Sequence, residues 1–298
     1  MLLNADRFFS AGKLPVSLFY THSSASLDWH CHDFSEIAIM LEGETDYETD
    51  FSSERISKGD VVIIIPGGNH RYRHEKNVSL MNLLFQFDRL PVPWFEVSNH
   101  PGFAALFGIR PDYYRKMHYY PKVHLDDSQI SRCEAILMPA WEAQTSGRAG
   151  ANMEVFGAFL LLTTMLLRAW GAIPPDNPRE IPGRLAASMD YMAHHFREPL
   201  SMAKLARLSC LSDATFTRHF KAATGVTPGN YLLRLRLQEA ARQLAGNKSI
   251  YEVAQSAGFA DSNYFARQFR KQTGLTPREF QKKYRAAPAI LHTVMERL

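Results

Sequence analysis

Four residues in the first quarter of the chain have side chains suited to binding chemistry. His30 and His32 alternate along the sequence, Glu36 follows them closely, and His70 lies further on. Three imidazoles and a carboxylate form a donor set that Fe, Mn, Ni, Zn and Cu accept. The same groups can instead hydrogen-bond the hydroxyls of a small ligand, or satisfy one another in a protein interior. The residues therefore predict either a site for a divalent transition metal or a polar ligand pocket.

These side chains lie within residues 16–87, where polar and apolar residues alternate as in β-strands. Segments such as GETDYETDF and GDVVIIIPGGNHRY favour strands, and glycines separate them as turns. In a strand, His30 and His32 point to the same side, so Glu36 and His70 can converge with them. We expect an all-β sandwich or small barrel of roughly eight strands, followed by helices.

Two motifs in this stretch resemble those of the cupin family. Residues 30–43, HCHDFSEIAIMLEG, have the His-x-His-x3-Glu-x6-Gly spacing of the first cupin motif. Residues 59–74 resemble the second, with Ile65 where proline is usual and His74 where asparagine is usual. The resemblance implies a cupin-like β-barrel (jelly roll) for the N-terminal part. It leaves open whether the polar residues inside hold a metal.

Aromatic residues near the histidines favour a small-ligand pocket. The faces of Trp29 and Tyr47 could pack against the C–H surfaces of a sugar, while histidine and glutamate bind its hydroxyls. The predicted effector-binding residues are Trp29, His30, His32, Glu36, Tyr47 and His70. The predicted ligands of a metal, if one binds, are His30, His32, Glu36 and His70.

The net charge of +4 conceals an asymmetry along the chain. Residues 183–298 contain 18 Lys and Arg against 8 Asp and Glu, a net charge of +10. Residues 1–182 contain 16 basic and 22 acidic residues, a net charge of −6. A basic half joined to an acidic half indicates that the basic half binds a polyanion.

Four prolines in residues 172–183, AIPPDNPREIPG, interrupt any helix and predict a linker. The sequence thus predicts a β-rich domain with trailing helices at 1–171 and an all-helical domain at 184–298. The apolar residues 152–170 predict a buried helix rather than a membrane span, and no N-terminal signal pattern precedes them. Three dispersed cysteines without a CxxC pair are typical of reduced thiols, so we expect a cytoplasmic protein.

The helical part contains an internal repeat. Residues 216–231, FTRHFKAATGVTPGNY, and 265–280, FARQFRKQTGLTPREF, match in phenylalanine, arginine, threonine, glycine and proline at one offset. Repetition of this kind marks a duplicated supersecondary unit. In each copy a short helix, a tight turn and a second helix closed by glycine predict a helix-turn-helix. The second helix of each pair is the one offered to a DNA major groove.

Residues 184–284 resemble the DNA-binding domain of AraC/XylS-family regulators. The second copy, IYEVAQSAGFADSNYFARQFRKQTGLTPREF, follows the family signature, with Phe280 in place of the usual tyrosine. The resemblance implies two helix-turn-helix units on one long helix, which contact successive major grooves. The family's groove-facing positions correspond here to Ala214, Thr217, Arg218, Ser262, Asn263, Ala266 and Arg267. Arginine suits guanine, asparagine adenine, and threonine or alanine a thymine methyl.

Two acidic residues stand out on this basic module. In similar activators, the side of the second unit that carries Glu252 and Asp261 can contact the sigma subunit of RNA polymerase. Both residues could instead stabilise helix ends. Helix 152–170 likewise allows two interpretations, pairing of two protomers or burial within one protomer.

The resemblance of the N-terminal part to sugar-sensing, rhamnose-regulator-like members implies an activator controlled by a small molecule, acting as a dimer at the bacterial nucleoid. The alternative is a metal-dependent cupin enzyme, or a metal sensor, fused to a DNA-binding domain. No further residue of the barrel is an evident base or nucleophile for catalysis, which favours a regulator that is not an enzyme.

Overall fold

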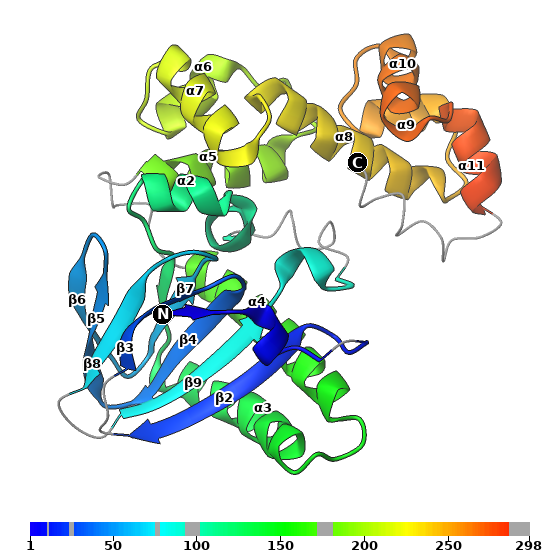
Figure 1. Ribbon diagram of the computed structural model, residues 1–298. Helices are drawn as coiled ribbons and strands as arrows, with labels where there is room; N and C mark the ends of the chain where they lie inside the picture. The colour runs from blue at the N-terminus through cyan, green and yellow to red at the C-terminus, as the bar shows by residue number, and fades with distance from the viewer. Residues whose placement is uncertain (11, 24–26, 75–77, 93–101, 172–180, 286–298) are drawn as a thin grey trace. The chain divides into compact units, whose positions relative to one another are not determined.

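The structure is a computed structural model that describes residues 1–298 except 11, 24–26, 75–77, 93–101, 172–180 and 286–298 (Figure 1). The chain forms two compact units. One unit consists of Met1–Pro91 and Pro111–Pro174, and the other of Val92–Arg110 and Pro175–Leu298. Most of the predicted linker lies outside the described residues, so the predicted boundaries at 171 and 184 stay predictions.

In the described part of the N-terminal unit, ten strands form two five-stranded sheets (Figure 1). The first sheet runs in the order β1 (Leu2–Leu3), β3 (Leu27–His32), β8 (His70–His74), β5 (Glu44–Thr49) and β6 (Ser53–Ser57). The second runs in the order β10 (Lys122–His124), β7 (Asp60–Ile64), β4 (Ser35–Glu42), β9 (Val78–Phe85) and β2 (Val16–Ser23). Strand β1 is parallel to β3, and the other pairs are antiparallel.

The prediction of a β-rich region at 16–87 is confirmed, because β2 to β9 all lie within it. Strands β1 and β10 come from outside that region and extend one edge of each sheet. Both sheets contribute to a shared core between them. Its buried residues are Ala38, Met40, Tyr47, Ile56, Val62, Ile64, Tyr72, Val78 and Leu80. Alternate residues of β4 and β7 face this core, so a polar residue in the same alternation faces it too.

Two helices pack against the second sheet, α3 (Asp127–Thr145) and α4 (Ala151–Gly171). They contact each other and β2, and α4 also contacts β10. Residues Ala151–Trp170 are long and apolar enough to cross a membrane by length and composition alone. Half of that helix is buried within the unit, as in the core helix of a globular domain. The prediction of a buried helix therefore agrees with its packing.

Short elements complete this unit. They are η1 (Ala5–Arg7), η2 (Phe87–Arg89) and α2 (Pro111–Lys116). Between η2 and α2 the chain contributes one turn of π-helix, η3 (Ala104–Gly108), to the C-terminal unit. There the Gly102 amide donates to Asp190 at 3.2 Å, and the Arg110 amide donates to the Ala223 carbonyl at 2.9 Å. The order of the elements along the chain does not predict that this segment packs in the C-terminal unit, because its partners Asp190 and Ala223 are distant in sequence.

The C-terminal unit is helical in its described part, as predicted (Figure 1). Its helices are α5 (Ile181–His195), α6 (Met202–Leu208), α7 (Asp213–Thr224), α8 (Pro228–Leu244), α9 (Ile250–Ser256), α10 (Ser262–Thr273) and α11 (Pro277–Arg285). Helix α5 begins three residues before the predicted domain start at 184. Its first turn accommodates Pro182 because the amides of a first turn have no helical partner.

Candidate functional site

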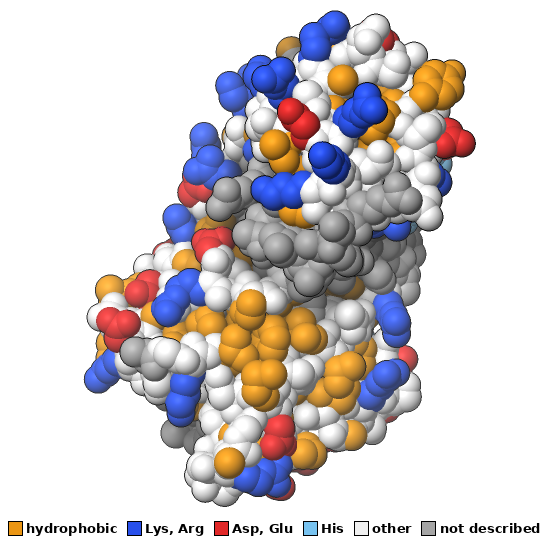
Figure 2. Space-filling model, turned by 90° about the vertical axis from the view of Figure 1, so that its right-hand side faces the viewer, with side chains coloured by type: hydrophobic (Ala, Val, Ile, Leu, Met, Phe, Trp, Pro, Cys, Tyr) orange, Lys and Arg blue, Asp and Glu red, His pale blue; other side chains and the backbone are white. Residues whose placement is uncertain are grey.

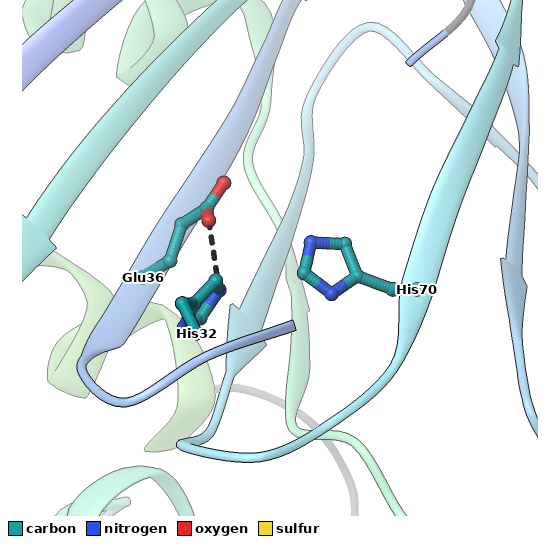
Figure 3. A group of neighbouring side chains, drawn as sticks. All are labelled: His32, Glu36 and His70. Carbon is teal, nitrogen blue, oxygen red and sulfur yellow. Dashed lines mark ion pairs between the residues drawn. The ribbon is translucent and has the colours of Figure 1, made fainter. Parts of the chain in front are cut away.

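The four predicted polar residues lie together inside the sheet-bearing unit. Strand β3 supplies His30 and His32, β4 supplies Glu36, and β8 supplies His70. His30 and His70 are register partners across the β3–β8 pair. All four side chains are buried between the sheets, each less than 5% exposed. Figure 3 shows His32, Glu36 and His70 pointing toward one another from three strands.

Each histidine is oriented by a hydrogen bond to a backbone carbonyl. The Nδ1 atoms of His30, His32 and His70 lie 2.9, 2.7 and 3.1 Å from the carbonyl oxygens of Asp28, Phe34 and Gly68. A carbonyl oxygen only accepts, so each Nδ1 carries the proton. The Nε2 atoms of the three rings are then available to a ligand. Metal-binding histidines are commonly held by this arrangement.

The inward-facing atoms are buried and close together. His32 Nε2 and His70 Nε2 have no hydrogen-bond partner among the described residues, although His32 Nε2 lies 3.0 Å from a Glu36 oxygen in ion-pair contact. One ligand atom each from His32, Glu36 and His70 lies within 4.8 Å of the others. Two nitrogens and one oxygen at this spacing fit a divalent transition metal. They also fit ligand hydroxyls, which both donate and accept hydrogen bonds.

Charge and burial oppose each other in this cluster. Burial alone would raise the pKa of Glu36, but the adjacent His32, with His70 and His30, holds that pKa below its usual value. Burial lowers the pKa of His70 to about 4, against the opposing effect of the Glu36 charge. At neutral pH the cluster therefore contains a carboxylate and a neutral His70, the forms that bind a metal or accept from a hydroxyl.

Tyr47 belongs to the same interior. The Tyr47 ring is fully buried with its centroid 6.0 Å from that of His70, and its hydroxyl has no partner among the described residues. Trp29, directly before His30, is partly exposed, and the Arg71 guanidinium lies 4.8 Å from the centre of its ring. The pairing of β3 with β8 shifts in register between Leu27 and His30, so alternation alone does not set the side that Trp29 faces. The role of Trp29 in effector binding stays a prediction.

Sequence reasoning missed Tyr72 as a residue of this interior. Its ring centroid lies 6.0 Å from His70 and 5.4 Å from Tyr47, and the residue is 1% exposed. Burial raises the pKa of its hydroxyl well above the usual value, so the phenol stays neutral. The signal was present, because Tyr72 lies two positions after His70 on the same strand and so faces the same side.

The second candidate site is a pair of helix-turn-helix units in the C-terminal unit. Helices α6 and α7 form the first, α9 and α10 the second, and α8 connects them. Phe216 and Phe220 are fully buried on α7, as Phe265 and Phe269 are on α10. These pairs fix which side of each helix faces the core. Lys and Arg side chains lie over this unit in the view of Figure 2.

The opposite sides of α7 and α10 carry the seven predicted DNA-contacting residues. Those exposed to solvent are Ala214, Thr217, Arg218, Asn263 and Arg267, and those partly exposed are Ser262 and Ala266. Neither Arg218 nor Arg267 lies on a buried side of its helix. The two copies thus present equivalent surfaces, since their phenylalanines hold them in the same rotation about the helix axis.

The helix ends of this unit are capped locally. Ser201, Ser212, Thr227 and Ser249 accept a backbone amide with their side chains, and Gly225 and Gly274 end α7 and α10 in left-handed conformations. Glu252 forms a capping box with Ser249, and Asp261 accepts from the Asn263 amide at 2.8 Å. Both acidic residues are exposed and both stabilise a helix start, so their local role is accounted for.

Comparison with known proteins agrees with these two sites. Residues 17–126 match the model of the AraC-like ligand binding domain, and residues 205–283 match a helix-turn-helix domain. The HTH-type transcriptional activator RhaS of Enterobacter sp. (strain 638) is 30% identical over 94% of this chain and 97% of its own. The chain belongs to the AraC family of transcriptional regulators. RhaS of Salmonella arizonae is also 30% identical, over 96% of this chain and 99% of its own.

Solved structures match the C-terminal part. The DNA-binding domain of AdpA, solved with a target DNA, is 32% identical, with a TM-score of 0.34 over 35% of this chain and 96% of its own. An AraC-type regulator from Chromobacterium violaceum is 32% identical, with a TM-score of 0.33 over 35% of this chain and 94% of its own. The two family models and the RhaS relatives, which match almost the whole chain, show that this AraC-family protein is a DNA-binding transcription regulator with an N-terminal ligand-binding domain.

Proposed function

We propose that this protein is a transcription activator controlled by a small polyhydroxylated molecule, a sugar, bound between its two sheets. The observation that carries the proposal is the cluster of inward-facing His32, Glu36 and His70, which lies within the AraC-like ligand-binding domain. RhaS relatives match almost the whole chain and are named transcriptional activators. The protein acts where its DNA lies, at the nucleoid in the bacterial cytoplasm.

The buried polar atoms explain why a hydroxylated ligand suits this interior. A buried acceptor without a partner costs about 1–3 kcal/mol, and a ligand that supplies the missing hydrogen bond recovers that free energy. His32 Nε2 and His70 Nε2 accept from ligand hydroxyls, and the Tyr47 hydroxyl donates or accepts. The rings of Tyr47 and Tyr72 supply apolar faces for the C–H side of a sugar.

A second candidate function follows from the same donor set. His32, Glu36 and His70, with His30 nearby, would hold a divalent transition metal, which supplies positive charge and Lewis acidity at that point. The result would be a metal-sensing regulator or, with a substrate, a metal-dependent enzyme. We favour sensing over catalysis, since the relatives are regulators and, among the described residues of the sheet-bearing unit, none beyond the donor set is an evident catalytic base.

A thermal melt of the full-length protein distinguishes these candidates. The protein is treated with a chelator, dialysed, and melted with sugars, sugar acids and divalent metal ions in turn. A ligand present at 100 times its Kd stabilises the folded state by about 2.7 kcal/mol. Stabilisation by one sugar but not its epimers supports the sugar proposal. Stabilisation by a metal ion alone, with no response to any sugar, contradicts it and supports the metal candidate.

At the DNA, we propose that the exposed sides of α7 and α10 enter successive major grooves. Arg218 and Arg267 contact guanine, Asn263 contacts adenine, and the small residues meet thymine methyls. The remaining proposed contacts are Ala214, Thr217, Ser262 and Ala266. Equivalent surfaces on the two copies support this orientation. In vitro selection of binding sites from random duplex DNA, followed by base-by-base substitution, tests it.

The outer side of α4 supports a homodimer. Met153, Leu160 and Leu161 are 64%, 37% and 53% exposed and recur at helical spacing. Figure 2 shows hydrophobic side chains gathered on one face of the N-terminal unit. Contiguous exposed apolar surface of this kind is typical of a protein–protein interface. We propose that a second copy of the chain covers this side of α4, and sedimentation at several concentrations tests the proposal.

Contact with the sigma subunit of RNA polymerase is proposed for Glu252 and Asp261. Both carboxylates are exposed on the second helix-turn-helix unit, near the start of α9 and α10. Because both also cap helices, a substitution must preserve the cap. Glu252→Gln retains a capping-box residue while it removes the charge. Loss of activated transcription with unchanged DNA affinity supports the contact, and unchanged activation contradicts it.

A further inference from the structure

Helices α7 and α10, the two helices proposed to enter the DNA grooves, lie at opposite ends of the connecting helix α8. Contacts within the protein must therefore set the distance between them. Helix α8 has 17 residues and is therefore about 25 Å long. Successive major grooves on one face of DNA are about 34 Å apart, or roughly 10 base pairs. One inserted base pair moves the second groove by about 3.4 Å and rotates it by about a tenth of a turn. Only a rigid pair of helices senses so small a change.

A buried carboxylate on α8 ties the two helix-turn-helix units together. The Glu239 side chain is 9% exposed and accepts hydrogen bonds from three neighbours. Gln243 donates at 2.6 Å, Arg242 at 2.9 and 3.0 Å, and Arg197 at 2.9 Å. Arg197 lies just after α5, the helix that packs on both α6 and α7 of the first unit. Glu239 thereby connects α8 to the first unit.

The segment Phe196–Glu198 is held from α8 by a second contact. Arg236 donates to the Phe196 carbonyl from Nε at 2.6 Å and to the Glu198 carbonyl from Nη2 at 2.8 Å. Both bonds hold the guanidinium against backbone carbonyls. Arg236 therefore has a structural role and is not a surface cation that contacts a DNA phosphate. Together, Arg236 and Glu239 hold this segment against α8 through hydrogen bonds. We call Arg197, Arg236 and Glu239 the clamp.

The second helix-turn-helix unit packs against the same segment at Gly258. This residue forms the turn between α9 and α10 with φ +88°, a conformation that favours glycine. A Cβ atom here would lie 2.8 Å from the Arg197 Cα and 2.9 Å from the Phe196 carbonyl oxygen. The turn of the first unit has Cys210 at positive φ instead, so a left-handed turn by itself tolerates a side chain. Close approach of backbone to backbone therefore explains glycine at 258.

A third connection runs from the clamp into α9. The Gln243 side chain donates to Glu239 and accepts from Ser256 at 2.5 Å and from Lys248 at 3.0 Å. Ser256 is the last residue of α9. Hydrogen bonds thus run without interruption from Arg197, through Glu239 and Gln243, to Ser256. The path joins the first unit, the connecting helix and the second unit.

We propose that Glu239 is a positioning residue for operator specificity: with Arg197, Arg236 and Gly258 it fixes the distance and rotation between α7 and α10, so that the protein selects operators by the spacing between their two half-sites. The proposal rests on both units meeting one DNA face, as proposed above. Glu239 itself contacts no base. A partly loosened clamp would let each unit find its groove separately and would weaken the preference for one spacing.

The test uses the full-length protein and an operator selected from random duplex DNA. Duplexes carry the selected spacing or one base pair more or fewer, and further duplexes have one half-site scrambled. We expect the wild type to lose about tenfold in affinity for each altered spacing, the loss of roughly one base contact. Glu239→Gln should reduce that loss to less than about threefold, while its base preference within each half-site is unchanged.

Control variants separate positioning from general destabilisation. Glu198→Gln removes the same charge from a side chain that is 58% exposed and pairs with His195, and it leaves in place the Glu198 backbone carbonyl that accepts from Arg236. This variant should therefore keep the wild-type spacing preference. Arg197→Ala breaks the clamp from a side chain that is 54% exposed, so it tests the idea even if Glu239→Gln unfolds. Wild-type spacing ratios in both clamp variants overturn the proposal. No loss on scrambling the second half-site overturns instead the two-unit contact on which it rests.

Discussion

The Nε2 atom of His32 and the Oε2 atom of Glu36 face each other at 3.0 Å between the two sheets. The other ring nitrogen of His32 donates its hydrogen to the Phe34 carbonyl. The carboxylate is in close contact with the imidazole, and this contact helps to hold the pKa of Glu36 below its usual value against the effect of burial. A ligand hydroxyl or a cation that enters the interior competes for the same nitrogen and oxygen atoms. This pair makes the interior responsive to what enters it.

Replacement of Glu36 should abolish the response to the effector. We expect Glu36→Gln to fold and to lose most of the ligand-induced shift in melting temperature, because the amide presents one acceptor oxygen and no charge. Glu54→Gln is the control, since that side chain is 45% exposed on β6. The measurement is the thermal melt with and without the stabilising ligand. An equal shift in both variants would place the binding site elsewhere.

Arg218 and Arg267 should each be needed for specific DNA binding. We expect Arg218→Ala and Arg267→Ala to weaken binding to the selected operator by about 1–3 kcal/mol each, while affinity for random DNA changes little. Arg234→Ala, on the exposed surface of α8, is the control. Fluorescence anisotropy with both DNAs at one salt concentration measures the difference. Equal losses on both DNAs would identify the arginines as phosphate contacts.

Affinity for DNA should fall steeply as salt rises. The net charge of +10 in residues 183–298 implies several phosphate contacts, and each contributes a slope of about −0.9 to the plot of log K against log salt concentration. Lys271→Gln, on an exposed position of α10, should reduce that slope by about one. Titrations between low and physiological salt measure it. Affinity independent of salt would contradict a phosphate-binding surface.

A charge on the outer side of α4 should separate the proposed dimer. We expect Leu161→Glu to shift the protein to a monomer, because burial of a carboxylate in an apolar interface is costly. Leu161 is 53% exposed within one protomer, so the fold itself should tolerate the change. Ser131→Glu, at an exposed position of α3, is the control. Sedimentation velocity of both variants measures the oligomeric state. A dimer that persists in Leu161→Glu would show that this side of α4 is not the interface.

The clamp should contribute a pH-dependent term to stability. Burial raises the pKa of Glu239, but the hydrogen bonds from Arg242, Gln243 and Arg197 outweigh it and lower that pKa to about 2, from 4.5. A lowered pKa stabilises the folded state above the unfolded value and loses that effect as pH falls from about 4.5 toward 2. The contribution is about 3 kcal/mol at neutral pH, of which about 2 should be lost by pH 3.

Urea unfolding of the full-length protein, followed by its helical circular dichroism signal at pH 6 and pH 3, measures the contribution of Glu239 to the free energy of unfolding. The difference in unfolding free energy between wild type and Glu239→Gln should narrow by the predicted amount at the lower pH. The other carboxylates titrate equally in both proteins, so the difference isolates Glu239. A constant difference across this range would show that the carboxylate is not held in its charged form.

Much of the DNA-binding half followed from local sequence signals. The repeated phenylalanines and the closing glycines predicted the second helix of each unit, and in the structure α7 and α10 end directly before Gly225 and Gly274. Such signals act through the chain's own hydrogen bonds and the burial of one helix side, both of which are local. For the same reason the exposed sides of α7 and α10 could be named in advance.

The barrel interior was partly predictable, since strand alternation sets which side chains share a face. His30, His32, Glu36 and His70 were found in this way, and the same rule applied to β8 would have included Tyr72. Strand alternation does not predict the hydrogen-bond partner of each imidazole ring. The carbonyls of Asp28, Phe34 and Gly68 orient the three imidazoles only once the turns and strands are assembled.

The sequence by itself thus indicated the family, the two helix-turn-helix units and the residues of the polar cluster, because each is marked by residue types at regular spacing within motifs. Tertiary structure alone decided the Glu239 clamp and the packing of residues 102–110 in the C-terminal unit. Both join residues far apart in the chain, through backbone carbonyls and a close approach at Gly258. Sequence spacing carries no record of such contacts, since they form only when packing brings distant segments together.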